Sequence, residues 1–294
     1  MRVTQNTTAN LVTNNLQTIR KRTEELQQQA STGYKVTMAS DDPVTAQQIL
    51  HMKSLMASGD QYARNISNGI AWLTMSEGAM SELGNVITRA KELTVAMSSE
   101  TNNDSSRQAA VNEFEELKAQ VITLGNTQLN GKYIFGGFKN DTPPFDSSGN
   151  FLGTDDAISV EVDHGSFVQM NYSGGELIRG TGGGTDIIAT LDNIIAALNS
   201  NDTSGVEAEL SNLDDALGQV LATRTDLGAR LTHLNSANTM IDNMNLSLTK
   251  ITSDKQDADM IQVISDLSKQ QTAYEAAVAA AAKISQISLL DYLS

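Results

Sequence analysis

The stretches LVTNNLQTIRKRTEELQQQA (residues 11–30) and IQVISDLSKQQTAYEAAVAAAAKISQISLLDYL (residues 261–293) decide the fold of this chain. In both, a set of mostly apolar or small residues recurs at alternating steps of four and three, which places the set along one side of a helix. Such a narrow seam needs a partner, and the expected partner of each end is the other end. The seam positions are Val12, Leu16, Ile19, Thr23, Leu26 and Ala30 at the start, and Ile264, Leu267, Gln271, Tyr274, Val278, Ala281, Ser285, Ser288 and Tyr292 at the finish.

A chain that leaves through a middle region and returns to pair its own ends is hairpin-shaped, and such a molecule suits assembly better than catalysis. The composition agrees with long helices rather than a wide core. Of 294 residues, 39% are hydrophobic and 4% aromatic, whereas ordinary globular domains hold about 45–50% apolar residues. There is no cysteine, which excludes disulfides and thiolate chemistry.

The formal charge of −15 argues against binding of nucleic acid through phosphate contacts. The charge is uneven, because residues 1–40 carry a net +3, residues 255–294 a net −2 and the middle the remaining −16. The short cluster Arg20, Lys21, Arg22 reads as a stripe that faces solvent or a partner. Neither an apolar signal-peptide core nor a run of about 18 apolar residues is present. These features alone indicate a cytoplasmic protein without membrane insertion.

The pattern between the ends predicts more helices. The first helix should run over residues 4–31 and stop at Gly33. Asp41, Asp42 and Pro43 form a helix cap motif, with Asp42 as the N-cap and Pro43 at the first helical position. Helices are then expected over residues 44–56, 61–97, 110–124 and 187–198.

The cleanest heptad lies between residues 206 and 248, and it predicts a helix of about 45 residues. Its seam is Val206, Leu210, Leu213, Leu217, Val220, Arg224, Leu227, Leu231, Leu234, Asn238, Ile241, Asn245 and Leu248. Arg224, Asn238 and Asn245 interrupt it. They either specify register at a cost in stability or are simply tolerated in a solvent-open bundle, and the sequence leaves both readings open.

A β-rich segment interrupts the helices. LNGKYIFGGF (residues 129–138) is rich in β-forming residues and glycine, and residues 158–162 and 168–172 alternate apolar with polar side chains around a hairpin loop at 163–166. The expected fold is mainly α with a small β-rich insertion, as an elongated hairpin-shaped chain. The expected domains are a terminal coiled coil (1–40 with 255–294), a long-helix bundle (41–138 with 186–254) and the outer insertion (139–185).

An enzyme is the main alternative of a different class, and little supports it. His51, His164 and His233 are far apart and form no metal-binding motif. The run Gly182–Gly184 lacks the GK[ST] ending of a phosphate loop and reads as a linker. A loop with Asp155, Asp156, Glu161 and Asp163 could hold a cation weakly but reads as a solvated acidic loop. No catalytic residue, cofactor or metal is therefore expected.

Several local motifs resemble the flagellin family. They are ASTGYKVTMASDDPVTAQQ (residues 30–48), NISNGIAWLTMSEGAM (65–80), SRQAAVNEFEEL (106–117), LNGKYIFGGF (129–138) and the last segment, from DADMIQ at residue 257 onward. The resemblance covers essentially the whole chain, least closely the β insertion. TPPF (residues 142–145), the ending ISLLDYLS (287–294) and the opening MRVTQ resemble the hook-associated branch of the family, which joins hook to filament. A minor filament flagellin is the alternative, followed by a coiled-coil protein of another type III secretion system.

The resemblance implies a structural adaptor subunit in a homomeric ring outside the cell, between an adjacent hook-associated protein and flagellin subunits. It also implies export in the unfolded state through the flagellar type III channel without a cleaved signal peptide, and a flagellar export chaperone that binds the C-terminal segment. The terminal helices are expected to order when subunits stack, because their partly polar seams bury too little to offset ordering entropy. The expected assembly residues are Val12, Leu16, Ile19, Leu26, Ile264, Leu267, Tyr274, Val278, Ala281, Ile284 and Leu290, and Ala277, Ile284, Ile287 and Leu290 give the last helix a second apolar side.

Overall fold

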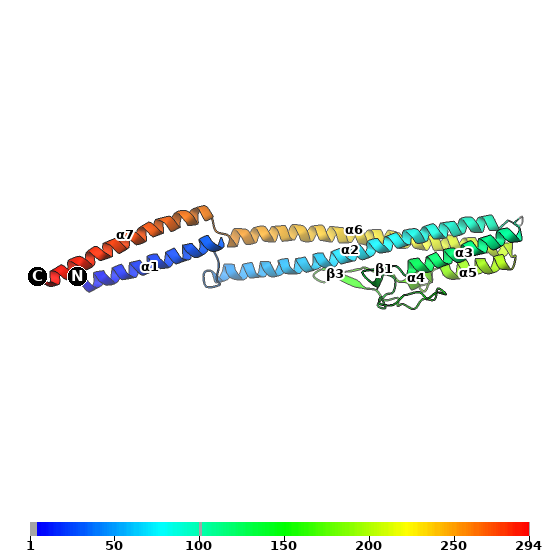
Figure 1. Ribbon diagram of the computed structural model, residues 1–294, viewed down its shortest axis with the longest axis horizontal. Helices are drawn as coiled ribbons and strands as arrows, with labels where there is room; N and C mark the ends of the chain where they lie inside the picture. The colour runs from blue at the N-terminus through cyan, green and yellow to red at the C-terminus, as the bar shows by residue number, and fades with distance from the viewer. Residues whose placement is uncertain (1–4, 100–101, 294) are drawn as a thin grey trace. The chain divides into compact units, whose positions relative to one another are not determined.

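The computed structural model describes the backbone of residues 5–99 and 102–293, and the side chains of residues 10–99 and 102–283. Helices dominate, with a small region of strands, which confirms the predicted fold class (Figure 1). The helices are α1 (Gln5–Thr32), α2 (Pro43–Met97), α3 (Asp104–Gly125), α4 (Gly174–Ile178), α5 (Ile187–Asn199), α6 (Thr203–Gln256) and α7 (Met260–Leu293). The strands are β1 (Gln128–Leu129), β2 (Lys132–Tyr133), β3 (Ser159–Asp163) and β4 (Ser166–Gln169).

The chain divides into two compact units. The terminal unit consists of Met1–Ala57 with Met244–Ser294, and the central unit is Ser58–Asn243. Long helices α2 and α6 each contribute to both units. The three-part division expected from the sequence, with boundaries at residues 40, 138, 185 and 254, stays a prediction.

The heptad of α6 is confirmed. Every second seam residue of α6, seven positions apart in the chain, is buried as far as residue 241, namely Val206, Leu213, Val220, Leu227, Leu234 and Ile241. Within the central unit this row packs against α2, where a Cβ added to Gly69 would lie 3.3 Å from Cδ1 of Leu234. Arg224, one of the polar seam residues, is held by Glu77 of α2, with Nη2 2.6 Å from Oε1.

Helix α2 is longer than predicted. The sequence favoured two helices, over residues 44–56 and 61–97, but one continuous helix spans Pro43–Met97. The reason is the position of Gly59, which is buried in register with Met52 and Ile66. A glycine in a helix costs about 1 kcal/mol relative to alanine. Here buried residues of the same helix face lie on both sides of Gly59, and the helix continues through it.

The strands form two small antiparallel pairs. Strands β1 and β2 join through Asn130 and Gly131, whose φ angles of 52° and 78° build a tight turn. Strands β3 and β4 pair with Val160 opposite Val168 around His164 and Gly165, which confirms the predicted hairpin. Only three residues of the predicted 129–138 segment are in strands, and the short helix α4 is absent from the sequence prediction.

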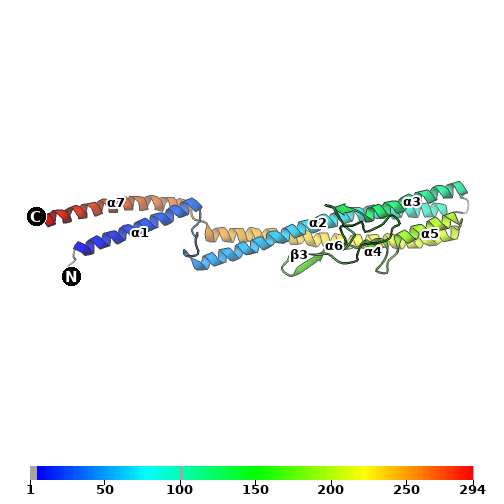
Figure 2. The ribbon, with the colours of Figure 1, turned by 60° about the horizontal axis from the view of Figure 1, so that its bottom comes forward.

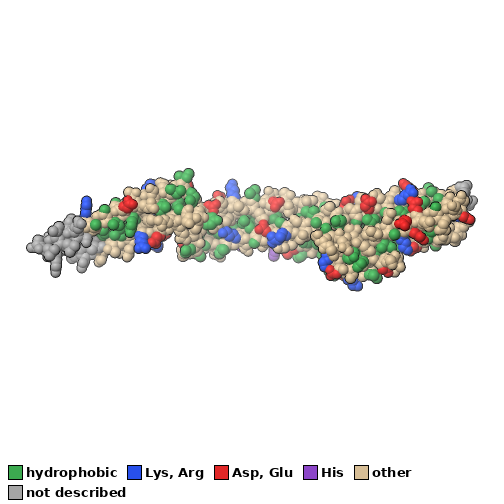
Figure 3. Space-filling model, in the orientation of Figure 1, with side chains coloured by type: hydrophobic (Ala, Val, Ile, Leu, Met, Phe, Trp, Pro, Cys, Tyr) green, Lys and Arg blue, Asp and Glu red, His purple; other side chains and the backbone are tan. Residues whose placement is uncertain are grey.

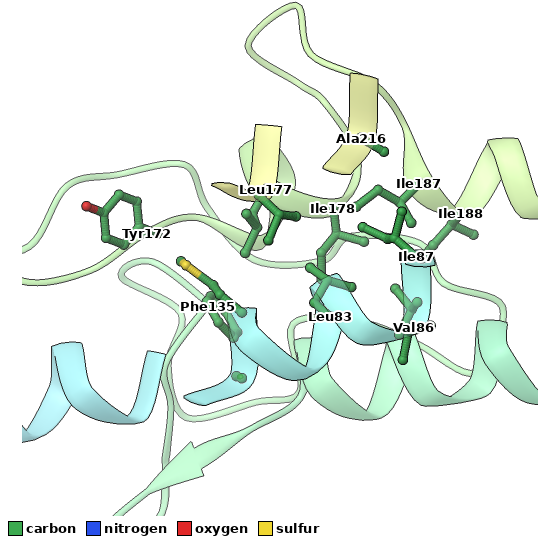
Figure 4. Close-up of a cluster of buried hydrophobic side chains, with 14 of the residues drawn as sticks. Leu83, Val86, Ile87, Phe135, Tyr172, Leu177, Ile178, Ile187, Ile188 and Ala216 are labelled. Atoms are coloured by element: carbon green, nitrogen blue, oxygen red, sulfur yellow. The ribbon is translucent and has the colours of Figure 1, made fainter. Parts of the chain in front are cut away.

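Side chains from the β-rich region join the helical core of the central unit. Figure 4 shows Phe135, Tyr172, Leu177 and Ile178 beside Leu83, Val86 and Ile87 of α2, Ile187 and Ile188 of α5, and Ala216 of α6. Helix α5 in turn packs on α3. The β-rich region is thus built onto the bundle through a shared apolar core.

Candidate assembly surface on the terminal helices

Helices α1 and α7 lie side by side in the terminal unit (Figures 1 and 2). On α1, the residues that approach α7 follow the predicted spacing: Val12, Leu16, Ile19 and Thr23 are half-buried and Leu26 is buried. The only other buried side chain among the described residues of this pair is Val263 of α7. The pairing therefore rests on a thin seam with two fully enclosed apolar side chains.

On α7, the predicted seam positions are only partly enclosed. Its buried or half-buried apolar positions include Val263, Leu267, Ala277 and Ala281, whereas Ile264, Tyr274 and Val278 are 58%, 39% and 44% exposed. Leu267 and Ala281 are thus half-buried in the single chain, whereas the other three side chains are exposed, Tyr274 beside α1. Ile284 and Leu290 lie outside the side chains that the structure describes.

Two linkers join the terminal helices to α2 and α6, and they are tied to each other. The Lys35 N–H donates to the carbonyl of Gln256 at 2.7 Å, and the Ala258 N–H donates to the carbonyl of Gly33 at 2.8 Å. The Lys35 Nζ adds a bond of 2.7 Å to the carbonyl of Asp254. Gly33 has a φ of 76°, where a glycine is favoured, so the sequence identifies this break correctly.

Asp42 lies at the N-cap position of α2, directly before Pro43. Its Oδ1 accepts from the N–H groups of Val44 and Thr45, each at 3.1 Å, and its Oδ2 accepts from the Thr45 hydroxyl at 2.6 Å. The hydrogen bond from the Thr45 hydroxyl contributes most to holding the pKa of Asp42 below its usual range. The carboxylate form is the one that caps the helix.

Asp41 has a different role from that of its neighbour. Its Oδ2 accepts from the N–H of Met38 at 2.8 Å and from the N–H and hydroxyl of Thr37 at 3.1 and 3.0 Å. These bonds, the one from Met38 first, lower the pKa of Asp41. Asp41 therefore shapes the turn before the helix, while Asp42 caps the helix itself.

Sequence reasoning missed the cap of α7. Asp259 accepts from the N–H groups of Ile261 and Gln262 at 3.0 and 3.2 Å. An acidic residue directly before an apolar run is the signal that identifies such a cap. Both helices that follow the linkers thus start on an aspartate.

Surface apolar side chains concentrate in the terminal unit. Among the described residues, 21 large apolar side chains are exposed, and 14 of them belong to the terminal unit although it is the shorter one. Figure 3 shows hydrophobic side chains at the surface of α1 and α7. Those of α7 are Met260, Ile261, Ile264, Tyr274 and Val278. A concentration of exposed apolar side chains in one unit is typical of interaction sites on soluble proteins.

A groove runs between α1 and α7 beside the exposed Tyr274. It is lined by Arg20, Thr23, Glu24 and Gln27 of α1 and by Gln271, Tyr274 and Glu275 of α7. Arg20 pairs with Glu24 at 2.9 Å and Arg22 with Glu25 at 3.0 Å. The basic cluster of α1 is therefore largely neutralised by acidic residues of the same helix.

The acidic loop residues of the central unit serve local structure. Asp155 accepts from the hydroxyls of Ser173 and Thr181, and Glu161 accepts from the N–H of Gly165 at 3.0 Å. Across the described residues, no group of three or more His, Asp or Glu side chains could hold a metal ion. In the same part of the chain, no helix combines the length and apolar character needed to cross a membrane.

Comparison with known proteins matches both ends of the chain. Residues 3–140 match the bacterial flagellin N-terminal helical region, and residues 210–293 match the bacterial flagellin C-terminal helical region. The two regions together hold α1, α2, α3 and α7 and most of α6.

Individual proteins align over most of their length. Flagellar hook-associated protein 3 of Escherichia coli K12 is 29% identical over 285 residues, which are 89% of this chain and 90% of that protein. Flagellin of Bacillus subtilis 168 is 25% identical over 301 residues, 97% of each chain. The crystal structure of the flagellar junction protein FlgL from Legionella pneumophila shares the fold, with a TM-score of 0.57 and 17% identity over 73% of this chain and 100% of that one.

Proposed function

Because this chain belongs to the bacterial flagellin family, we propose that it is a structural adaptor subunit that forms a homomeric ring where the flagellar hook meets the filament. Its similarity to a protein named flagellar hook-associated protein 3 supports the location. The motif at residues 142–145 and the C-terminal sequence 287–294 favour the same branch of the family. The role is structural rather than catalytic.

One observation carries the proposal: the terminal unit exposes apolar side chains on a helix pair that buries few of its own. Ile264, Tyr274 and Val278 are exposed in the single chain. An apolar stripe on a helix is stabilised when a second helix covers it. Neighbouring copies, or the terminal helices of related subunits, supply such helices.

Assembly then completes a fold that a single copy holds weakly. Leu26 and Val263 alone are buried in the described part of the α1/α7 pair, and fixing each backbone residue costs about 1–2 kcal/mol of conformational entropy. Contacts along Leu16, Leu267 and Val278 in the ring would add the missing burial. We therefore propose that α1 and α7 gain most of their stability when subunits stack.

The partners follow from the position in the flagellum. They are an adjacent hook-associated protein on one side, flagellin subunits on the other, and copies of this chain within the ring. The subunit is exported unfolded through the flagellar type III channel without a cleaved signal peptide, and a flagellar export chaperone binds the C-terminal segment before export. The absence of cysteine suits this route, since no disulfide can form on the way.

A minor filament flagellin is the second candidate, because flagellin of Bacillus subtilis aligns over 97% of this chain. The same terminal helices would then serve a subunit distributed along the filament. The identity to the hook-associated protein is higher, 29% against 25%, which favours the junction.

Antibody labelling of intact flagella, viewed by electron microscopy, separates the candidates. A compact band where hook meets filament is the expected result. Label along the whole filament would make the chain a flagellin. Flagella without any label, from cells that express the chain, would refute a flagellar role altogether.

A further inference from the structure

The central unit contains a pocket where α4 and the glycine run that follows it meet α6. Its cavity volume is about 280 Å³. Sites for drug-sized ligands measure about 300–1,000 Å³, so this pocket suits a group no larger than one long side chain. The lining residues are Tyr172, Ser173, Glu176, Leu177, Gly182, Gly184, Gln219 and Thr223.

The glycine run at residues 182–184 forms one wall of this pocket and is held by a side chain of α6. Gln219 Oε1 accepts from the Thr185 N–H at 2.8 Å, and Gln219 Nε2 donates to the carbonyl of Glu176 at 3.0 Å. A Cβ on Gly184 would collide with Gln219 Oε1, so this close approach requires glycine. The same glutamine thus fixes the run and α4, and the pocket is preformed.

Glu176 is the one charged side chain among the lining residues. It is exposed, and its Oε1 lies 4.0 Å from a Cβ built on Gly182, which places the carboxylate beside the glycine run. It forms no ion pair with any described residue. The hydroxyls of Tyr172, Ser173 and Thr223 all donate hydrogen bonds within the fold. The carboxylate is therefore the group that remains for a ligand.

Two arginines beside the pocket residues are paired with other carboxylates. Arg179 follows Glu176 by three residues, a spacing at which opposite charges on a helix can pair, but its Nη2 lies 3.2 Å from Oδ2 of Asp186 instead. Arg230 pairs with Asp226 at 2.7 Å, and its guanidinium covers the Tyr172 ring at 4.7 Å from the centroid. Neither arginine neutralises Glu176.

The charge of the central unit favours a cation at this carboxylate. The unit holds ten basic and 25 acidic residues and carries the entire net charge of −15. A phosphate would meet both Glu176 and this negative field, so the glycine run does not serve as a phosphate loop. A cation gains from both, because a cleft of one charge sign concentrates ions of the opposite sign.

We infer that this pocket binds a small organic cation, namely a protonated amine or a guanidinium on a short alkyl stem. The charged head pairs with Glu176, and the stem lies against the apolar surface of Tyr172 and Leu177 (Figure 4). The inference goes beyond the proposed assembly function and is independent of it, because no lining residue belongs to α1 or α7. A failure of assembly would leave it untouched.

Two matched threonines of α6 test the preference for a cation. Thr223 lines the pocket and Thr225 is exposed, and the hydroxyl of each donates to the carbonyl four residues earlier at 2.9 Å. Because the chain has no cysteine, T223C and T225C each give the full-length chain a single thiol. Reaction rates with 2-aminoethyl methanethiosulfonate, a cation, and with 2-sulfonatoethyl methanethiosulfonate, an anion, give a cation-to-anion ratio for each position.

The ratio at T223C should exceed the ratio at T225C by about tenfold or more. A unit charge about 6 Å away changes the local concentration of each charged reagent about tenfold at an effective dielectric constant of about 40. In the T223C background, E176Q should lower the ratio to the T225C value. E207Q removes an equal charge from an exposed position near the start of α6 and should leave the ratio unchanged. Equal ratios at the two threonines, or equal effects of E176Q and E207Q, would overturn the inference.

Direct binding to the unsubstituted chain completes the test. Butylguanidinium and neutral butylurea have the same shape and differ in charge, and isothermal titration calorimetry measures both. We expect a dissociation constant of about 1–10 mM for butylguanidinium, because one exposed ion pair contributes little. Butylurea should bind at least tenfold more weakly, and E176Q should abolish the difference. Equal affinity for the two probes, or an unchanged affinity in E176Q, would refute the cation site.

A blocked arginine, N-acetyl-arginine methylamide, separates two sources of such a group. Binding as tight as that of butylguanidinium supports a basic side chain of another protein as the occupant. Binding of butylguanidinium alone supports a free amine or guanidine. Binding of neither compound contradicts the inference.

Discussion

Gly125, the last residue of α3, is expected to tolerate no side chain because Phe145 covers it. A Cβ built there lies 2.6 and 2.7 Å from Cδ2 and Cε2 of Phe145 and 3.1 Å from Cδ1 of Ile178. The ring cannot turn away, since Phe145 is 2% exposed and a Cβ on Gly174 would meet it at 2.7 Å as well. Gly125→Ala therefore tests how tightly the β-rich region is locked onto the bundle.

Two opposing effects set the magnitude. Alanine in place of a helical glycine gains up to about 1 kcal/mol, and overpacking of a close-packed core costs about 1–3 kcal/mol. Because the added Cβ would lie less than 3 Å from the enclosed ring of Phe145, the overpacking cost should lie near the upper end of this range. We expect a net loss of about 1–2 kcal/mol, which lowers the melting temperature of a unit of this size by about 2–8 °C.

Gly228 of α6 provides the matched control, because a Cβ there meets nothing within 4 Å. Gly228→Ala should raise the free energy of unfolding by about 0.5–1 kcal/mol. Thermal unfolding followed by circular dichroism, with urea titration of both variants, measures the two signs. A Gly125→Ala variant as stable as the parent would refute the idea that Phe145 is clamped between α3 and α4.

Three further predictions concern assembly, the α6 seam and the linkers. Val278→Asp should abolish self-assembly of the full-length chain, measured by sedimentation, without changing the melting temperature of the central unit. Val95→Asp, at a similarly exposed valine of α2, should assemble normally, and equal behaviour of the two variants would argue against an assembly role for α7. Arg224→Leu should leave the free energy of unfolding unchanged or raise it by about 1 kcal/mol. The leucine continues the apolar seam, and Glu77, the partner that Arg224 leaves behind, is 42% exposed and can be solvated. A loss above about 1 kcal/mol in urea titration would instead assign control of the helix register to the ion pair. The pKa values of Asp41 and Asp42 are lowered in the folded chain. Their stabilising effect is therefore complete above the unfolded-state pKa of about 3.9 and is lost as pH falls through the lower folded-state pKa values. The amide chemical shifts of Met38 and Thr45 should accordingly change with midpoints below about pH 3.9, and midpoints above that value would contradict the assigned hydrogen bonds.

The helices with a single strong period could be predicted from the sequence. In α6, large apolar residues stand at one angular position and polar residues surround them, so the periodicity leaves one solution for the buried face. The hairpin of β3 and β4 was equally clear, since alternation and a His-Gly turn agree. Local chemistry was sufficient for Gly33 and Asp42, because each acts within a few residues of the chain.

The face of α7 could not be predicted to the residue. Val263 and Ile264 are adjacent and equally apolar, and the alanine-rich stretch after Tyr274 offers two sides of similar character. Which side meets α1 depends on packing rather than on periodicity. Continuity of α2 through Gly59 has the same origin, because the seam that stabilises the helix there involves residues on both sides of the glycine.

A single copy of this chain has to satisfy two opposed requirements. It needs apolar surface that neighbours can cover, yet it must not associate indiscriminately before it reaches its site. The distribution of side chains is compatible with both, because the exposed apolar side chains concentrate in the terminal unit while a net charge of −15 opposes non-specific association. A consequence is that loss of an exposed apolar side chain such as Val278 should weaken assembly without destabilising the central unit.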